Sequence, residues 1–94
     1  MLPTVKVIGN LGPFTVKQCK DGNENINGKF YMSIRPVGSL SHYLHNDGLV
    51  RPSTTQFIDG IEQFTGWYTS LSEVAEAYAK YLVLTDISTN ESQA

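Results

Sequence analysis

Residues 64–82 read FTGWYTSLSEVAEAYAKYL, an extended aromatic run that leads into an amphipathic helix. Ser70 and Glu73 have the spacing of a capping box, in which each side chain satisfies a free backbone N–H near the helix start. From Leu71 onward, apolar residues recur with the 3.6-residue period of one helical face. This predicted stripe consists of Leu71, Val74, Ala75, Tyr78 and Leu82. A sheet or another helix has to cover such a stripe, so the segment predicts where the core forms.

The chain before this helix is dominated by strand patterns. The predicted strands are Thr4–Ile8, Phe14–Cys19, Lys29–Arg35, Gln56–Ile58 and Glu62–Tyr68, while Ser39–Asn46 reads as two turns of helix. Turn dipeptides between the strands favour short hairpin connections and antiparallel pairing. We therefore expect an α+β fold, a curved antiparallel sheet of four to five strands with one C-terminal amphipathic helix packed across it. The predicted core is Phe14, Val16, Phe30, Met32, Ile34, Phe64, Tyr68, Leu71, Val74, Tyr78 and Leu82.

Length and composition indicate one small domain. Of the 94 residues, 1–87 are predicted to form a single α+β domain and 88–94 a polar, disordered tail. Val83–Ile87 could continue the helix or form a last strand. The start of the chain does not have the pattern of a secretory signal, and no apolar run approaches the roughly 20 residues of a membrane helix. We expect a cytoplasmic protein without a membrane partner.

The residues offer little for catalysis or metal binding. His42 and His45 lie three positions apart with Asp47 close by, but no second cluster supplies the further ligands of a tetrahedral metal site. The single cysteine, Cys19, has no nucleophile signature around it. Neither a phosphate-binding loop nor a dinucleotide fingerprint is present. We therefore expect a non-catalytic protein with no metal and no cofactor.

One hypothesis for function is single-stranded nucleic-acid binding. Residues 1–52 carry six basic and three acidic residues, a net charge of +3, whereas residues 53–94 carry one basic and six acidic residues, a net charge of −5. If Val5 and Val7 face the helix, strand alternation places basic residues and an aromatic ring on the open face of the sheet, as in some single-strand binders. These candidate residues are Lys6, Lys17, Lys29, Tyr31 and Arg35.

The hypothesis that we prefer is protein binding, with a second copy of the chain as one candidate partner. Trp67 is out of phase with Phe64 and Tyr68, so strict alternation turns it away from the core, whereas a bulge at Gly66 would turn it inward. Tyr81 also lies off the predicted stripe. Exposed Trp and Tyr are typical of interface hot spots. A short chain without motifs is typical of phage and mobile-element accessory proteins, so the expected role is modulation, such as inhibition, of a host protein.

Overall fold

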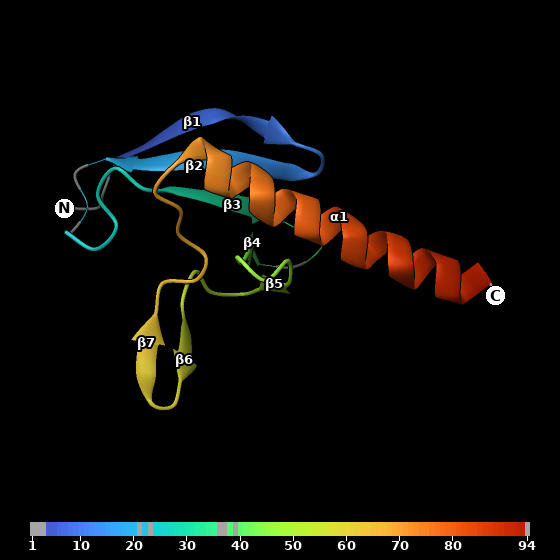
Figure 1. Cartoon of the computed structure of the whole chain (residues 1–94). Helices are drawn as coiled ribbons and strands as arrows, with labels where there is room; N and C mark the ends of the chain where they lie inside the picture. Colours follow the sequence, from blue (N-terminus) through green and yellow to red (C-terminus); the bar gives the residue numbers. More distant parts are fainter. Residues whose placement is uncertain (1–3, 21, 23, 36–37, 39, 94) are drawn as a thin grey trace.

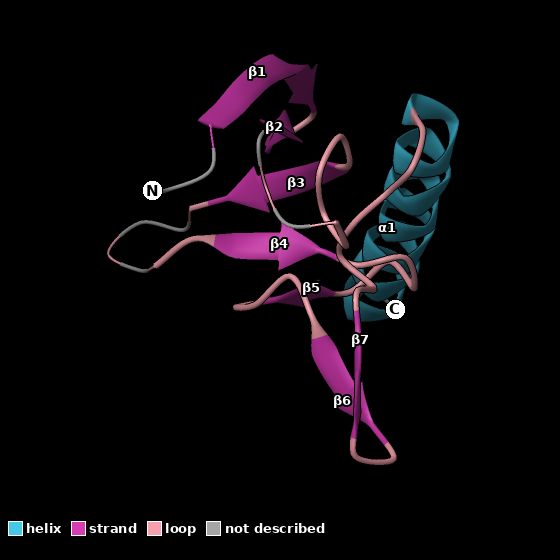
Figure 2. Ribbon diagram, turned by 90° about the vertical axis from the view of Figure 1, so that its left-hand side faces the viewer, coloured by secondary structure: helices cyan, strands magenta, loops and turns pink. Residues whose placement is uncertain are grey.

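The computed structural model describes residues 4–20, 22, 24–35, 38 and 40–93, with side chains described as far as Asp86. An antiparallel sheet of five strands follows chain order: β1 (Thr4–Leu11), β2 (Phe14–Lys20), β3 (Phe30–Ile34), β4 (His42–Leu44) and β5 (Val50–Arg51). A separate hairpin of β6 (Gln56–Ile58) and β7 (Ile61–Gln63) projects away from the sheet (Figures 1 and 2). The helix α1 (Leu71–Gln93) ends the chain. The expected α+β fold, an antiparallel sheet with one C-terminal helix, is confirmed.

The helix covers one face of the sheet only (Figure 2). Its C-terminal half extends past the sheet, so only its first half takes part in the core (Figure 1). Within the described part of the chain, no helix combines the length and the apolar character that crossing a membrane requires. The opposite face of the sheet therefore stays open to residues from loops and turns.

The helix starts where the capping pattern predicts. The backbone N–H of Glu73 donates to Oγ of Ser70 at 3.2 Å, which is one half of the expected box. The Glu73 carboxylate does not return to Ser70. Instead, the backbone N–H and the hydroxyl of Thr69 donate to Oε2 of Glu73 at 2.8 and 2.7 Å. These bonds lower the pKa of Glu73 and fix the direction in which the chain enters the helix.

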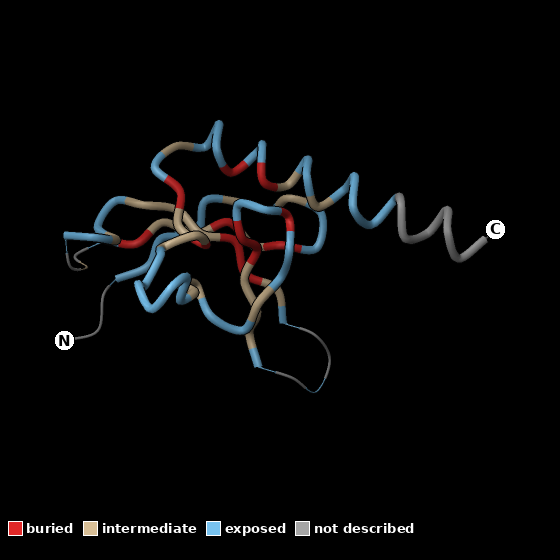
Figure 3. The backbone as a smooth tube through the Cα atoms, turned by 60° about the horizontal axis from the view of Figure 1, so that its bottom comes forward, coloured by how far each residue is buried: buried red, intermediate tan, exposed pale blue. Residues whose placement is uncertain are grey.

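The core lies between the sheet and the first half of α1 (Figure 3). Its buried apolar side chains are Phe14, Val16, Met32, Leu44, Tyr68, Val74 and Ala77, with Leu11, Phe30, Ile34, Tyr78 and Tyr81 packed at its edge. The predicted helical stripe is therefore rotated. Leu71 and Leu82 are exposed, whereas Ala77 and Tyr81 face the sheet.

The register of β1 contradicts one predicted orientation. Val5 pairs with Cys19 and Val7 with Lys17. Directly paired residues share a face of the sheet, and Lys17 alternates with Val16, which lies in the core under the helix. Val5 and Val7 therefore lie on the face away from the helix, not toward it as expected.

Two predicted elements also differ in the structure. Residue 39 lies outside the described residues, and His42–Leu44 forms β4 instead of helix because it pairs with β3 and β5. The last strand ends at Gln63, and the segment that leads to Trp67 is a turn in which Trp67 N–H donates to the Phe64 carbonyl. Of the two alternatives left open for Val83–Ile87, the structure has the helix, which is described as far as Gln93.

A candidate binding face built from aromatic residues

Trp67 lies on the open face of the sheet, opposite α1. The backbones of Phe30 and Tyr68 exchange two hydrogen bonds of 2.8 Å, which adds the chain at Tyr68 to β3 as one isolated bridge. Tyr68 points into the core, where its hydroxyl donates to the Leu44 carbonyl at 2.7 Å. Its predecessor Trp67 therefore lies over the other face, beside Tyr31.

Gly66 makes this turn possible by close approach rather than by a bulge. Its N–H donates to the Thr54 carbonyl at 2.9 Å. A Cβ atom at position 66 would lie 2.7 Å from that carbonyl oxygen and 3.0 Å from the Thr54 Cα. The contact locks the loop before β6 against the turn before α1 and fixes the direction of Trp67.

Three rings form a connected cluster that we call the aromatic face: Trp67, Tyr31 and Tyr43. The rings of Trp67 and Tyr31 pack edge to face with centroids 4.9 Å apart, and those of Tyr31 and Tyr43 with centroids 5.8 Å apart. Such geometry stabilises aromatic pairs beyond the burial of their area. The three rings come from β3, β4 and the turn before α1, so the sheet holds them in place before anything binds.

The rings border a cleft of about 390 Å³. Its lining is mostly apolar and consists of Val5, Cys19, Ile26, Tyr31, Tyr43, Thr54 and Trp67. Cys19 forms the buried floor, while Val5 at the sheet edge stays exposed. The cleft thus has the shape and lining of a site for an apolar side chain.

The polar atoms of the aromatic face have no acceptor or donor among the described residues. This holds for the indole N–H of Trp67 and the hydroxyls of Tyr31 and Tyr43, none of which makes a hydrogen bond there, although none is sealed from solvent. Burial and the neighbouring Tyr43 raise the pKa of Tyr31, so its hydroxyl stays a donor at neutral pH. Buried Tyr and Trp usually satisfy these groups, so the face offers donors to a ligand.

The basic residues predicted to share the open face are not all on it. Lys17 is there, paired with Tyr31 across β2 and β3. Lys6 pairs with Gln18 and lies on the opposite side. Lys29 precedes β3 and lies close enough to Glu73 to lower the pKa of that carboxyl, and Arg35 is exposed just after β3. The structure thus brings together Lys17 and Tyr31 but not the whole predicted set.

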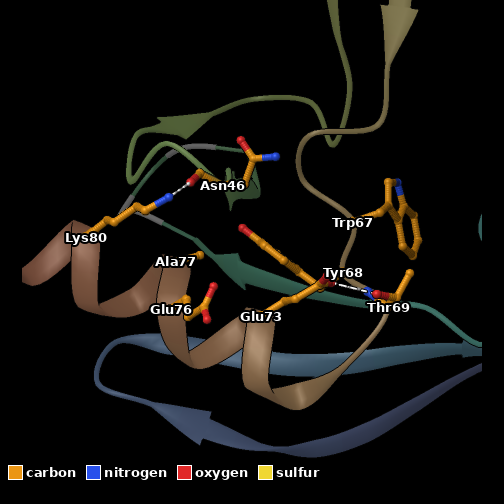
Figure 4. Close-up of a pocket in the computed structure, with 8 residues that line it drawn as sticks. All are labelled: Asn46, Trp67, Tyr68, Thr69, Glu73, Glu76, Ala77 and Lys80. Atoms are coloured by element: carbon orange, nitrogen blue, oxygen red, sulfur yellow. Dashed lines mark hydrogen bonds between the residues drawn. The ribbon is translucent and has the colours of Figure 1, made fainter.

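A second, polar cleft of about 350 Å³ lies between α1 and the turn at residues 67–69 (Figure 4). It is lined by Asn46, Trp67, Tyr68, Thr69, Glu73, Glu76, Ala77 and Lys80. The Lys80 ammonium donates to the Asn46 carbonyl at 3.1 Å, and burial raises the pKa of Tyr68. Trp67 lines both clefts, which makes it the residue that joins them.

His45, one of the two histidines considered for metal binding, lies inside the molecule. His45 is fully buried, with Nδ1 2.6 Å from Oγ1 of Thr65 and Nε2 2.6 Å from the Ser53 carbonyl. Because a carbonyl only accepts, Nε2 carries the proton and Thr65 donates to Nδ1. Burial lowers the pKa of His45, so the ring is neutral. Among the described residues, no group of three or more potential ligands could hold a metal ion.

Tyr81, the second residue predicted for protein binding, lies elsewhere. Its ring packs edge to face on Phe14 with centroids 4.9 Å apart and stacks on Tyr78 at 6.0 Å, at the margin of the core. Sequence reasoning missed Tyr43, because His42–Leu44 was read as helix. A strand there would have placed Tyr43 opposite Ser33, on the face of Tyr31. Comparisons with protein-family models, curated proteins and solved structures found no match.

Proposed function

We propose that this chain is a small non-catalytic binding module, and that its aromatic face binds another protein. One observation carries the proposal. Trp67, Tyr31 and Tyr43 form a prearranged cluster beside an apolar cleft, and their polar atoms have no partner among the described residues. Trp and Tyr dominate binding energy at interfaces, because they bury a large area at a small cost in conformational entropy.

The surroundings of the aromatic face support a protein partner. Val5 and Val7 at the edge of β1 are exposed on the same side of the sheet. These two valines extend the apolar surface away from the rings. Lys17 lies beside Tyr31, and Arg51, which pairs with Tyr43 at the border of the aromatic face, is held by Asp47. A mostly apolar and aromatic surface that carries only a few charged groups matches the usual composition of a protein interface.

Site-specific photocrosslinking in the cells that produce the protein tests this proposal. A photoreactive phenylalanine analogue at position 43 should give one dominant crosslinked protein, whereas the same analogue at position 57, which is exposed on the projecting β6–β7 hairpin, should not. With the crosslinked protein in hand, Trp67→Ala should weaken binding at least about 30-fold, as expected for a hot spot of about 2 kcal/mol. Phe57→Ala is the matched control and should leave binding unchanged. Equal crosslinking at positions 43 and 57, or equal affinity of both variants, would contradict the proposal.

Single-stranded nucleic acid is the second candidate ligand for the same face. Lys17 pairs with Tyr31, whose ring contacts those of Trp67 and Tyr43, and single-strand binders combine aromatic rings with nearby cations. The net charge of −2 and the position of Lys6 on the other side of the sheet favour the protein partner.

Trp67 is the sole tryptophan, so its fluorescence reports directly on this alternative. A mixed-sequence single-stranded oligonucleotide at low salt should quench Trp67, with an affinity that falls steeply as salt rises. Lys17→Glu should abolish the quenching. Unchanged emission over the whole titration at low salt would exclude nucleic acid as the ligand.

A further inference from the structure

Helix α1 carries apolar residues on two of its sides. One side packs on the sheet through Val74, Ala77, Tyr78 and Tyr81. A second set lies about 120° further around the helix, because each residue turns by about 100°, and no part of the described chain covers this set. We call it the outer stripe; it consists of Leu71, Ala75, Ala79, Leu82 and Val83, with Leu71, Leu82 and Val83 51%, 46% and 57% exposed.

The outer stripe has the spacing of a self-complementary helix contact. Leu71, Ala75, Ala79 and Val83 are four residues apart and form one continuous ridge along about 18 Å of helix. In an antiparallel copy, Ala75 meets Ala79 and Leu71 meets Val83, because the order large, small, small, large reads the same in both directions. Ridges of this kind pack into each other at about −50°. The alanines allow close approach at the crossing point, and the larger residues fill the wider space at each end.

A groove beside the outer stripe can accept Leu82, the one residue of the stripe that is not part of the ridge. Ile8 of β1 faces Leu71 and Ala75 across a largely apolar depression of about 240 Å³. Leu82 lies on the same side of the helix as Leu71. In the antiparallel pair Leu71 meets Val83, so Leu82 of one copy lies at the groove of the other. The exposed Ile8 would be buried by this contact.

Charges on the other flank of the stripe fit the same arrangement. Glu76 and Lys80 are both exposed and lie one turn apart on the side away from Ile8. The antiparallel register sets Glu76 of one copy near Lys80 of the other, twice by symmetry. The bond from Lys80 to the Asn46 carbonyl holds the ammonium in this region while leaving donors free. Asp86 would lie near the N-terminus of the partner helix, which favours an acidic group.

We propose that the outer stripe binds a second copy of this chain as an antiparallel helix pair, with Leu82 seated in the partner's groove between Ile8 and Leu71. The contact is isologous, as two-fold symmetry requires, and two-fold dimers are the commonest soluble oligomers. It is independent of the function proposed for the aromatic face, because that face lies on the opposite side of the sheet and stays open in both copies.

Sedimentation equilibrium of the full chain tests the dimer. The wild type should be dimeric at about 100 µM and dissociate on dilution, because oligomer stability depends on protomer concentration. Ala79→Glu places a charge at the crossing point on an exposed helical site and should give a monomer with unchanged circular dichroism. Phe57→Glu is the matched control, since Phe57 is also exposed but lies on the β6–β7 hairpin, and this variant should stay dimeric. A wild type that is monomeric throughout, or a dimer that Phe57→Glu and not Ala79→Glu dissociates, would overturn the proposal.

A charge exchange tests the antiparallel register. Glu76→Lys alone should weaken the dimer, because it sets four cations on one flank. Glu76→Lys together with Lys80→Glu should restore it, because the two reciprocal pairs form again with exchanged signs. Equal dissociation constants for the wild type, the single and the double variant would show that these residues do not meet, which would overturn this register.

Discussion

The buried ring of His45 shows how one residue fastens two loops to the sheet. It follows β4 directly and bonds to Thr65 and Ser53, which belong to the segments on either side of the β6–β7 hairpin. Removing the ring would leave a cavity and would take away the hydrogen-bond partner of both Thr65 and the Ser53 carbonyl. We expect His45→Ala to lower the free energy of unfolding by about 2–4 kcal/mol. Urea denaturation measures this change, and His42→Ala is the control because His42 is only half-buried.

His42→Ala should cost clearly less than His45→Ala. Equal losses would show that the two bonds of His45 do not fasten the loops. The lowered pKa of His45 also gives a sign for pH dependence. The unfolded chain binds this proton more readily than the folded chain, so stability falls as the pH drops below about 6.5.

Asp47 is another residue whose contacts shift its pKa. Bidentate bonds from Arg51, of 3.0 and 2.7 Å, together with the Leu49 N–H, lower the pKa of Asp47 to about 2. A lowered carboxyl pKa adds stability that is present above the ordinary value near 4 and is lost as the pH falls toward 2. Because the Asp47 side chain is 42% exposed, this contribution should stay at or below about 1 kcal/mol. Carboxyl NMR should give the low midpoint in the wild type and a midpoint near 4 in Arg51→Gln; a midpoint unchanged between the two would contradict the pairing.

At the scale of elements, the start of α1 depends on its cap. The Glu73 N–H donates to Oγ of Ser70, which is the only side-chain acceptor that it has among the described residues. Ser70→Ala should therefore cost about 1 kcal/mol of unfolding free energy. Ser72→Ala changes the same residue type two positions later, inside the first turn, where alanine favours the helix. The two variants should shift the urea midpoint in opposite directions or by clearly different amounts, and equal shifts would argue against the cap.

The turn between the hairpin and α1 depends on the missing side chain of Gly66. A Cβ atom there would meet backbone, 2.7 Å from the Thr54 carbonyl oxygen, and backbone cannot rotate away as a flexible side chain does. We expect Gly66→Ala to destabilise the fold by about 1–3 kcal/mol and to change the emission of the adjacent Trp67. At Gly9 a Cβ atom has open space within 4 Å, so Gly9→Ala should be close to neutral. Similar effects of both substitutions would mean that close packing at Thr54 is not the cause.

The elements that the sequence predicted well are those with local causes. The helix start follows from Ser70 and Glu73, and the pairing of β2 with β3 from alternation over Phe14–Cys19 and Lys29–Arg35. What failed depends on partners far away in the chain. Tyr43 forms strand because β3 and β5 flank it.

The candidate site fails to appear in the sequence for the same reason. Val5 faces outward because the bulge between Val7 and Gly9 shifts the register of β1. The sequence left open whether Trp67 turns away from the core or into it, because its contact with Tyr31 depends on the bridge between Phe30 and Tyr68. The alternation of apolar and polar residues along the chain does not reveal which strands are neighbours in the sheet.

At the scale of the whole molecule, stability should be unevenly distributed. Strands β2 and β3 lie inside the sheet with partners on both sides, and their side chains form much of the core. The β6–β7 hairpin projects from the sheet (Figure 2), and among the described residues each of its strands pairs only with the other. Phe57 of β6 is 72% exposed. The bond from the Gly66 N–H to the Thr54 carbonyl closes the base of the hairpin, and the bonds of His45 to Ser53 and Thr65 attach the flanking segments to the rest of the chain. The hairpin should therefore open without global unfolding.

Amide hydrogen exchange measures this difference. The amides of Val16 and Met32 should exchange only through global unfolding, and those of the β6–β7 hairpin at least about a hundredfold faster through local opening. Phe57→Ser should then change the free energy of unfolding by less than about 0.5 kcal/mol, because an exposed side chain contributes little to a core that it does not touch. Hairpin amides that exchange as slowly as those of β2 would contradict this arrangement. If the hairpin amides exchanged slowly at high protein concentration but not at low concentration, another copy of the chain would cover the hairpin. The contact proposed for the outer stripe does not cover it.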